Sequence, residues 1–579
     1  MKKLDFSIES IGRKLFIGFA IASIFNIIFT EFNFNDKHFA DHISLGKTLI
    51  IIITSFLVLM KYSKNKKYLK IEPFLMIGLT LMFLFVINTK YENFYFSLAS
   101  ILIMSFIVFK YYPKIDFKIS DKKTKILYII FGLLFISFIS YTLILNYLRF
   151  LSTNFDFGIF SQVYYNMTKT GISYATSVRD YVTTQLHIHF SPILYLILPI
   201  YYIFPSPITL LVMQGVLVAL GLIPLYKLCK HYKLNNFYTV IIGLIFIFHP
   251  SIIGGNLYYF HENNFLVPLI LWLLYYIEKN NYKMTIVFAF LTCFVKEDAP
   301  IFVVIIGLYY MFFKDKRKIG LGLIFGGLIY FFTVILFLRH FGDGVMNYRY
   351  SFFIDEHDSL IKLVINVIKN PGYLLKVISD YERFVYLVYI LVPLGLIPLS
   401  LKKKRQLILY IPLLIICLMS SHRHQYEIIF HYGFGPTTLF FYLLIVNFKE
   451  IKKETRDKLL ITGFSSALIF FASIYFLEFK NLSLYLNEKD KITILNKAVN
   501  MIPEENSVKA TTFLVPQLSQ RKYVYEFEPG DMHQDLLTDY IVMDLRFKDL
   551  IVEDEFKDYE IIYEEPDIVR VYKREGAKT

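Results

Sequence analysis

The sequence has few charged residues and very few cysteines for its length. Only 19% of its 579 residues are charged, whereas 56% are apolar. A water-soluble protein of this size would carry far more charge. The three cysteines, Cys229, Cys293 and Cys417, lie in or beside apolar segments. They form no disulfide framework and have no metal-ligand spacing. The composition therefore excludes a soluble multidomain protein and a disulfide-stapled scaffold.

Long apolar segments take up much of the chain. Each is about the length of a helix that crosses roughly 30 Å of hydrocarbon at about 1.5 Å per residue. Examples are residues 13–30, 44–60, 126–147, 206–227, 319–338 and 459–477. No small-residue cleavage site follows the first segment, so we expect a membrane helix there rather than a cleaved signal peptide. The pattern predicts an all-α polytopic membrane protein with about fifteen spans.

The net charge of +14 comes from short lysine and arginine clusters between the apolar segments. Such clusters are typical of cytoplasmic loops, so we expect no nucleic-acid partner. The positive-inside rule predicts a cytoplasmic N-terminus and an external C-terminus in the cell membrane.

Two segments fit this topology only if neither crosses as one helix. Residues 190–204 contain several prolines, which interrupt helices. We therefore expect an interrupted external or re-entrant element there. Residues 284–313 predict two short helices joined by a turn at Lys296-Glu297-Asp298. One continuous helix would place three charges at mid-membrane, at a cost of about 2.5–3.5 kcal/mol each.

The chain divides into three parts. Residues 1–125 form N-terminal membrane helices of unknown role, residues 126–478 a membrane core with external loops, and residues 479–579 a small external soluble α/β domain. The last part has more charge. Its pattern predicts a helix near 489–501 and short β-rich segments at 508–514, 522–527, 540–545 and 560–573. It contains no phosphate loop and no nucleophile motif. We expect residues from about 480 onward to fold on their own.

The unusual polar residues gather in the predicted external loops and in the turn. Several have plain structural interpretations: Asp156 as a helix cap, and His187 and His189 as partners of loop backbone. The pair His261-Glu262 could equally be an ordinary loop pair. Ionisable residues inside a membrane segment are functional candidates by default, which favours a functional interpretation of the Lys296 turn. The same loops also contain Arg179, Asp180, Tyr258, Arg349, Arg423 and His431.

Several motifs together resemble the membrane proteins of the DUF2079 family, over residues of about 145–575. They are Phe155-Asp156-Phe157-Gly158-Ile159-Phe160-Ser161-Gln162, His189-Phe190-Ser191-Pro192-Ile193-Leu194, Phe204-Pro205-Ser206-Pro207 with Gln214, Phe260-His261-Glu262, Val295-Lys296-Glu297-Asp298 and His431-Tyr432. That family is similar in layout to the GT-C glycosyltransferases. In those enzymes an acid in the first large external loop acts in catalysis, a proline-containing segment follows, and a lysine lies at a later external helix break. Asp156, Pro192 and Lys296 match that order.

The resemblance implies a GT-C-like membrane core that transfers a sugar from a polyprenyl-phosphate donor to an acceptor on the external side. The candidate catalytic residues are Asp156, His189, His261 and Glu262. The candidate substrate-binding residues are Lys296, Glu297, Asp298, Arg349, Arg423 and Tyr259. Membrane lipid is the other expected partner.

Cofactor dependence is open at this point. Many GT-C enzymes have two adjacent acids in the first loop, whereas Phe157 follows Asp156 here. No cofactor is firmly implied, although a divalent metal is possible. The side chains of His187, His189, His261, Glu262, Glu297 and Asp298 supply enough ligand types, but not at the spacing of a known metal motif.

Two other functions fit parts of the sequence. Broken helices with charges at depth are also features of transporters and lipid flippases. An inverted internal repeat would favour that function, and none is evident in the sequence. A non-catalytic membrane scaffold that presents the tail would leave the Lys296-Glu297-Asp298 turn unused.

Overall fold

The computed structural model describes residues 7–30, 37–63, 66–113, 118–178, 181–314, 316–344, 346–400, 404–527, 537–547, 556 and 558–577. Within these residues, nine helical segments are long and apolar enough to cross a membrane. They are α1 Ile8–Phe29, α2 Leu45–Tyr62, α3 Lys66–Asn88 (by its part Ile71–Asn88), α4 Phe94–Tyr111, α5 Asp121–Leu148, α9 Pro207–Ala219 with α10 Leu222–His231, α11 Asn236–Phe248 with α12 Pro250–Leu257, α16 Arg317–Phe341 and α21 Lys453–Ile474.

Shorter helices complete the bundle. They are α13 Leu266–Glu278, α14 Tyr282–Cys293, α15 Pro300–Phe313, α17 Leu360–Lys369, α18 Pro371–Ile378, α19 Tyr381–Leu391 and α20 Phe434–Asn447. The expected helical membrane protein with a small α/β tail is confirmed. The full count of about fifteen spans stays a prediction, as do the sides on which the termini lie.

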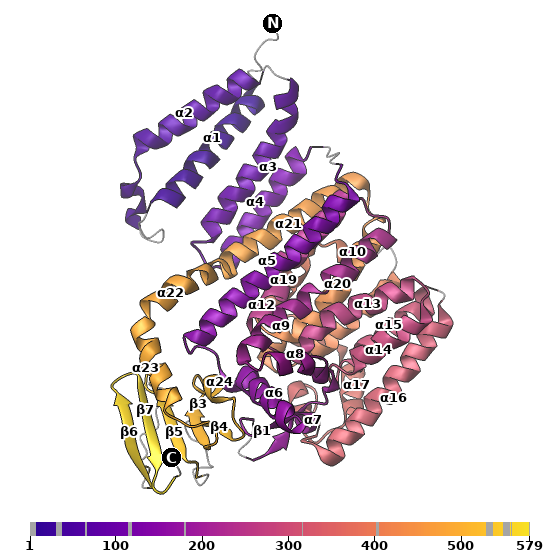
Figure 1. Ribbon diagram of the computed structural model, residues 1–579. Helices are drawn as coiled ribbons and strands as arrows, with labels where there is room; N and C mark the ends of the chain where they lie inside the picture. Colours follow the sequence, from indigo (N-terminus) through magenta and orange to yellow (C-terminus); the bar gives the residue numbers. More distant parts are fainter. Residues whose placement is uncertain are drawn as a thin grey trace.

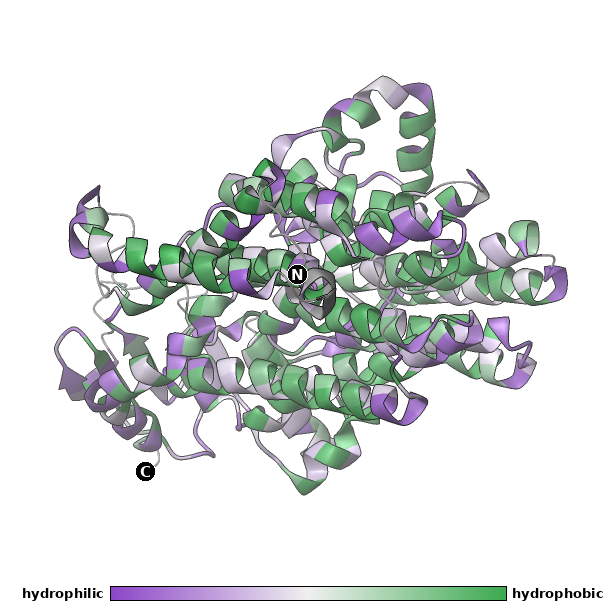
Figure 2. Ribbon diagram, turned by 90° about the horizontal axis from the view of Figure 1, so that it is seen from above, coloured by the Kyte–Doolittle hydropathy of each residue, from purple (hydrophilic) through white to green (hydrophobic). Residues whose placement is uncertain are grey.

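The membrane core carries apolar side chains on its outer surface. On α16, Phe325 is 61% exposed and Leu336 is 67% exposed. Figure 2 shows the helices predominantly green, while purple residues gather at helix ends, in loops and in the tail. Exposed apolar residues over whole helices are stable only where hydrocarbon replaces water.

The N-terminal helices α1 to α4 extend from one end of the bundle (Figure 1). α3 and α4 pack against α21 through a small apolar cluster that includes Leu84, Met104 and Phe470. α1 and α2 lie beyond this contact, farther from the site described below.

Both exceptional segments have the expected form. Residues 190–204 are broken into the 3-10 turn Pro192–Leu196 and the short helix α8 Leu198–Ile203. Residues 284–313 form α14 and α15, separated by a turn that holds Lys296, Glu297 and Asp298. Pro300 begins α15, at a helix position where a missing N–H costs nothing. The turn therefore lies between two helices, as the charge argument predicts.

Within its described residues, the tail is a five-stranded mixed sheet with three short helices. The strand order is β4-β3-β5-β7-β6, with β3 parallel to β4 and β5. The helices are α22 Asn481–Asn487, α23 Lys489–Asn500 and α24 Val515–Leu518, and the strands are β3 Val508–Thr511, β4 Val524–Phe527, β5 Tyr540–Asp544, β6 Tyr559–Glu565 and β7 Val569–Arg574. The predicted β-rich segment at 560–573 forms the hairpin β6–β7, which turns at Asp567 (φ 59°).

The tail packs on the end of the bundle where α5 ends and α6 (Ile159–Thr170) begins (Figure 1). Phe150, just beyond α5, lies in the hydrophobic core of the tail and is 1% exposed. The expectation that residues from about 480 onward fold alone stays a prediction, because in the whole chain this core also uses Phe150.

Candidate functional site

Five loop segments, far apart in the sequence, bring charged and histidine side chains together. Asp156 lies in the irregular turn Asn154–Gly158, and Glu262 begins the 3-10 turn Glu262–Phe265. Lys296 lies between α14 and α15. Arg349 belongs to the turn Asn347–Tyr350, and His431 to the turn His431–Gly433. Asp156, Glu262, Lys296 and Arg349 interact electrostatically, which links four of these segments directly.

Asp156 has an unusual backbone conformation, with φ 65° and ψ −60°. These angles are close to those of the classic γ-turn, a rare and strained conformation. The side chain accepts a hydrogen bond from the Tyr258 hydroxyl. Burial first, and then the negative charge of Glu262, raise the pKa of Asp156 to about 7, although Lys296 lowers it. A carboxyl group with this pKa can exchange a proton near neutral pH.

Lys296 and Glu262 form a buried ion pair beside Asp156. The Lys296 Nζ atom lies 3.3 Å from Glu262 Oε1, and the two side chains are 1% and 0% exposed. Burial alone would lower the pKa of Lys296, but Glu262 and Glu297 outweigh it and raise the pKa. Lys296 Nζ and both Glu262 carboxylate oxygens lack hydrogen-bond partners among the described residues. Buried polar atoms of native proteins are nearly always bonded, so this ammonium is available to a ligand or to water.

His189 and Glu297 form a second pair next to the first. His189 Nδ1 lies 2.8 Å from Glu297 Oε1. Burial alone would raise the pKa of Glu297, but His189 and Lys296 outweigh it and lower the pKa to about 2. Glu297 is therefore a permanent anion that orients the His189 ring and adds to the negative field around Lys296.

His261 and His431 stack face to face, with ring centroids 3.4 Å apart and ring planes at 14°. They are 3% and 1% exposed. Burial lowers the pKa of both rings, and Lys296 and Arg349 lower it further. Two neutral rings can stack at this distance, whereas two imidazolium cations would repel each other.

The same rings belong to the only cluster of three potential metal-ligand residues found within the described part of the chain. One ligand atom each from Asp156, His261 and His431 lie within 4.8 Å of one another. Two histidines and a carboxylate suit zinc or another transition metal. Ligand atoms of a tetrahedral zinc ion lie about 3.4 Å apart, given bonds of about 2.0–2.1 Å. Parallel stacked rings do not aim their nitrogen lone pairs at one point. The present arrangement therefore does not fit a metal ion unless one ring turns.

An amphipathic cavity of about 460 Å³ adjoins the charged turn. Glu297, Asp298 and Arg349 supply its charged lining. Apolar side chains of α15, α16, α17 and the helical segment Leu413–Leu418 form most of the remaining wall. Arg349 also lies over the Tyr432 ring at 5.3 Å and donates a hydrogen bond of 3.3 Å to its hydroxyl. The cavity thus joins an apolar space to one cationic side chain, Arg349, and two acidic ones, Glu297 and Asp298.

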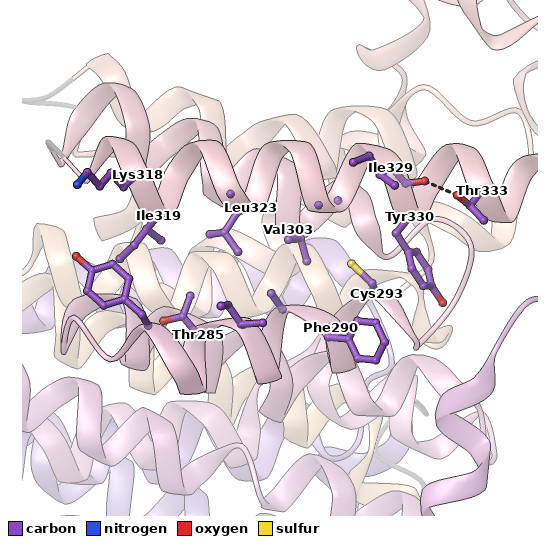
Figure 3. A pocket seen from close by; sticks show the side chains of 16 residues that line it. Thr285, Phe290, Cys293, Val303, Lys318, Ile319, Leu323, Ile329, Tyr330 and Thr333 are labelled. Atoms are coloured by element: carbon purple, nitrogen blue, oxygen red, sulfur yellow. Dashed lines mark hydrogen bonds between the residues drawn. The ribbon is translucent and has the colours of Figure 1, made fainter.

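A separate apolar groove of about 530 Å³ lies between α14 and α16 (Figure 3). Lys318 lies at one end of this groove, and Phe290 and Tyr330 lie toward the other. It contains none of the predicted site residues. Gly322 and Gly326 line it, and no atom of the described residues lies within 4 Å of where a Cβ would stand at either position.

Three predicted loop residues make their contacts elsewhere. Arg423 is 66% exposed and pairs with Glu427 at 2.6 Å and with Glu382 at 3.6 Å. Tyr259 donates its hydroxyl to the carbonyl oxygen of Leu151, and its ring stacks on Phe157 with centroids 5.4 Å apart. Tyr259 therefore supports the Asp156 loop rather than lining the cavity.

The third predicted loop residue, His187, contacts a neighbouring loop through its backbone. Its carbonyl oxygen accepts a hydrogen bond of 3.0 Å from the N–H of Asp343. Arg179 and Asp180 lie outside the described residues.

A family model described as a predicted membrane protein, DUF2079, matches residues 146–557. The chain belongs to this family. The match covers most of the chain and confirms the resemblance indicated by the motifs. In this DUF2079 protein the matched range contains all the residues of the cluster and most of the tail, whereas α1 to α4 lie outside it.

No curated protein matches the sequence. Two solved structures to which this DUF2079 protein is similar are of ArnT from Cupriavidus metallidurans. In complex with undecaprenyl phosphate, ArnT is 10% identical, with a TM-score of 0.46 over 78% of this chain and 98% of ArnT. In the apo state it is 9% identical, with a TM-score of 0.41 over 77% of this chain and 97% of ArnT.

Four residues that join the cluster or support it were not among the predicted site residues. His431 and Tyr432 belong to a family motif, and Tyr258 precedes Tyr259, so sequence position had already placed them nearby. Asn154 directly precedes the motif that begins at Phe155, but this position does not indicate what its side chain contacts. Its importance comes from its contacts with the tail, which lies more than 350 residues away in the sequence.

Proposed function

We propose that this protein is a membrane glycosyltransferase that transfers a sugar from a polyprenyl-phosphate donor to an acceptor hydroxyl group. The observation that carries this proposal is the union of two features in one place. The first feature is the Asp156 carboxyl group beside the buried ammonium of Lys296. The second is an apolar cavity, whose charged end adjoins this pair. A lipid phosphate has this combination of a charged head and a hydrocarbon chain.

The donor would place its phosphate near Arg349 and Lys296 and its hydrocarbon chain along the apolar wall. Phe331 and Ile335 of α16 and Leu363 of α17 belong to that wall. Hydrogen bonds between cations and phosphate oxygens are among the stronger ones in proteins. Arg349 Nε has no hydrogen-bond partner among the described residues, so it can donate to such an oxygen.

In the proposed reaction Asp156 is the general base. The acceptor hydroxyl transfers its proton to the Asp156 carboxylate, and its oxygen forms a bond to the anomeric carbon of the sugar. The bond between that carbon and the phosphate oxygen breaks, and the polyprenyl phosphate leaves with the electron pair. Lys296 and Arg349 stabilise the negative charge that develops on the phosphate.

The remaining residues of the cluster hold the charged and histidine side chains in place and adjust their pKa values. Glu262 holds the Lys296 ammonium in place, and Glu297 orients His189, which faces the same turn. Asp298 belongs to the cavity wall, where burial and then the charge of Glu297 raise its pKa. The neutral ring of His261 can donate or accept a hydrogen bond to the acceptor.

We propose that this transfer needs no metal ion. The stacked rings of His261 and His431 do not converge on one point, and Lys296 with Arg349 supplies the positive charge that a metal would otherwise bring. We also place the reaction on the external side, in keeping with the basic clusters of the opposite loops. The position of the cluster at one end of the bundle supports transfer rather than transport, since transporter sites lie near the bilayer midplane.

The test is transfer by purified protein in proteoliposomes. Polyprenyl-phosphate donors with different labelled sugars would be supplied, and water-soluble and lipid products would be read by mass spectrometry. The proposal predicts release of polyprenyl phosphate that depends on Asp156 and Lys296. A deletion strain should also accumulate a lipid-linked sugar. Turnover of none of the donors, together with an unchanged lipid-linked sugar pool, would refute it.

A further inference from the structure

The tail holds the chain on the N-terminal side of Asp156 through a buried anchor. Phe150 follows the end of α5 and has a left-handed backbone, with φ 54°. Its ring is 1% exposed and lies among tail residues that include Leu495 and Val515. A bulky residue rarely adopts this conformation, and it persists only where its surroundings fix it. The chain leading to Asp156 therefore begins from a fixed point inside the tail.

A tail arginine binds the backbone at the same point. Arg546 donates hydrogen bonds to the carbonyl oxygens of Arg149 at 3.2 Å and Phe150 at 2.8 Å. Asp544 holds the guanidinium group with bonds of 2.7 and 2.9 Å. Because the guanidinium is planar and fixed at one side, it holds both carbonyl groups in a defined position.

Asn154 makes a second set of contacts, two residues before Asp156. Its backbone N–H donates to Thr512 Oγ1 at 3.2 Å. Its side-chain Nδ2 donates to Glu526 Oε2 at 2.6 Å and to the carbonyl oxygen of Ser177 at 2.7 Å. The bond to Glu526 is charge-assisted, a class that is stronger than a bond between neutral groups.

The tail also contacts the chain on the C-terminal side of Asp156. Ser519 donates to the Ser161 hydroxyl at 2.7 Å, and Gln162 donates to the carbonyl oxygen of Lys522 at 3.0 Å. The segment that contains Asp156 is thus attached to the tail at both ends.

These contacts use an edge of the tail sheet that commonly forms a binding site. Thr512 follows β3, Glu526 lies in β4, and Asp544 ends β5, so all three lie toward the carboxyl ends of the parallel strands. In open α/β sheets, ligands bind at the carboxyl ends of parallel strands. Here that edge receives residues 149–154 of the same chain.

We propose that the tail is a positioning domain for the Asp156 loop, and that Arg546 and Glu526 are its positioning residues. The role in catalysis rests on the proposed function, whereas the role in ordering the loop does not. The sparsely populated backbone of Asp156 needs surroundings that determine it from outside. Misplacement of a reacting group by about 1 Å can lower a rate by about 10²-fold.

The experiment compares Glu526→Ala and Arg546→Lys with the control Arg570→Lys in the full-length protein. Arg570 lies in the β6–β7 hairpin of the same domain, where it pairs with Glu564 at 2.8 Å. Among the described residues, Arg570 makes no hydrogen bond or ion pair with residues 149–162. Hydrogen exchange measured by mass spectrometry reports the order of residues 151–157 without any substrate. Steady-state kinetics report kcat and KM for the donor separately.

The proposal predicts faster exchange at residues 151–157 in both test variants, with the exchange of β3 and β5 unchanged. It also predicts that kcat falls at least about tenfold while KM for the donor stays within about twofold, since the donor cavity is untouched. The control should match wild type in both measurements. Unchanged exchange at 151–157 in both variants would overturn the proposal, and so would a matching change in Arg570→Lys. If wild type transfers no sugar, the proposed function fails, but the exchange result still decides whether the tail orders the loop.

Discussion

Replacing Asp156 with asparagine distinguishes a role of this residue as general base from a purely structural role. The substitution is nearly isosteric, so the strain of the backbone at this position, with φ 65° and ψ −60°, should be the same for asparagine as for aspartate. The amide oxygen can still accept the hydrogen bond from Tyr258. An amide cannot take a proton near neutral pH, so we expect transfer to fall by about 10²- to 10⁴-fold.

The same substitution should lower the rate of transfer but raise the stability of the folded protein. The pKa of Asp156 rises from an ordinary 3.8 to about 7 in the folded protein. The folded state therefore binds its proton more tightly than the unfolded state does. Ionising Asp156 in the folded state therefore lowers the free energy of unfolding. This loss of stability is absent below pH 4 and fully present above pH 7. About three pKa units correspond to at most about 4 kcal/mol, and this cost is absent from Asp156→Asn. The variant should therefore be more stable than wild type at pH 8 and equally stable at pH 4.

Three measurements test this reasoning. The first is the rate of sugar transfer from a lipid-phosphate donor, and the second is thermal unfolding in detergent at pH 4, 6 and 8. The third is the pH profile of wild type, whose rate should fall about tenfold per pH unit below pH 7, as the base becomes protonated. Asp355→Asn, at an exposed acid in another loop, is the matched control and should behave as wild type. A variant with close to wild-type transfer, or a wild-type rate that is flat between pH 5 and 7, would refute the assignment of Asp156.

Four further expectations follow from the structure. Lys296→Met should abolish transfer and lower stability by about 3–5 kcal/mol, since it leaves Glu262 buried and unpaired; adding Glu262→Gln should restore unfolding behaviour in detergent but not transfer. Gly158→Ala should reduce transfer and cost about 1–3 kcal/mol, because its Cβ would stand 2.6 Å from Asn154 Oδ1; Gly322→Ala in α16, where nothing lies within 4 Å, should be neutral or stabilising in the same assays. Chelators should leave the rate unchanged and elemental analysis should find well below one equivalent of metal, whereas one tightly bound ion that is needed for activity would contradict the metal-free proposal. Reporter fusions should place the N-terminus in the cytoplasm and the C-terminus outside, and a cytoplasmic C-terminus would contradict the predicted topology.

Local physical requirements made several features readable from the sequence. Apolar runs of membrane length predict membrane helices because a spanning segment must satisfy its own backbone hydrogen bonds. The cost of charges at mid-membrane predicts the break at Lys296-Glu297-Asp298, and α14 and α15 end on either side of it. Proline spacing predicts the interruption within residues 190–204.

The composition of the cluster was partly predictable for the same reason. Asp156, His189, Glu262 and Lys296 are polar residues that membrane segments and their edges rarely carry without a use. Their partners were not predictable, because a pairing such as His189 with Glu297 joins segments 108 residues apart. Arg423 looked equivalent to Arg349 in the sequence, yet it pairs with Glu427 and Glu382 instead of lining the cavity.

The amino-acid sequence by itself determined that this chain crosses a membrane, where its helices break and which polar residues are costly enough to need a role. Those properties depend on local composition and on the free energy of placing each residue in hydrocarbon. Only the tertiary structure decided that His261 stacks on His431, that Tyr259 supports a loop, and that the tail encloses Phe150 and contacts Asn154. Such contacts depend on how distant segments pack, and no local pattern around Asn154 specifies a glutamate 372 residues farther along the chain.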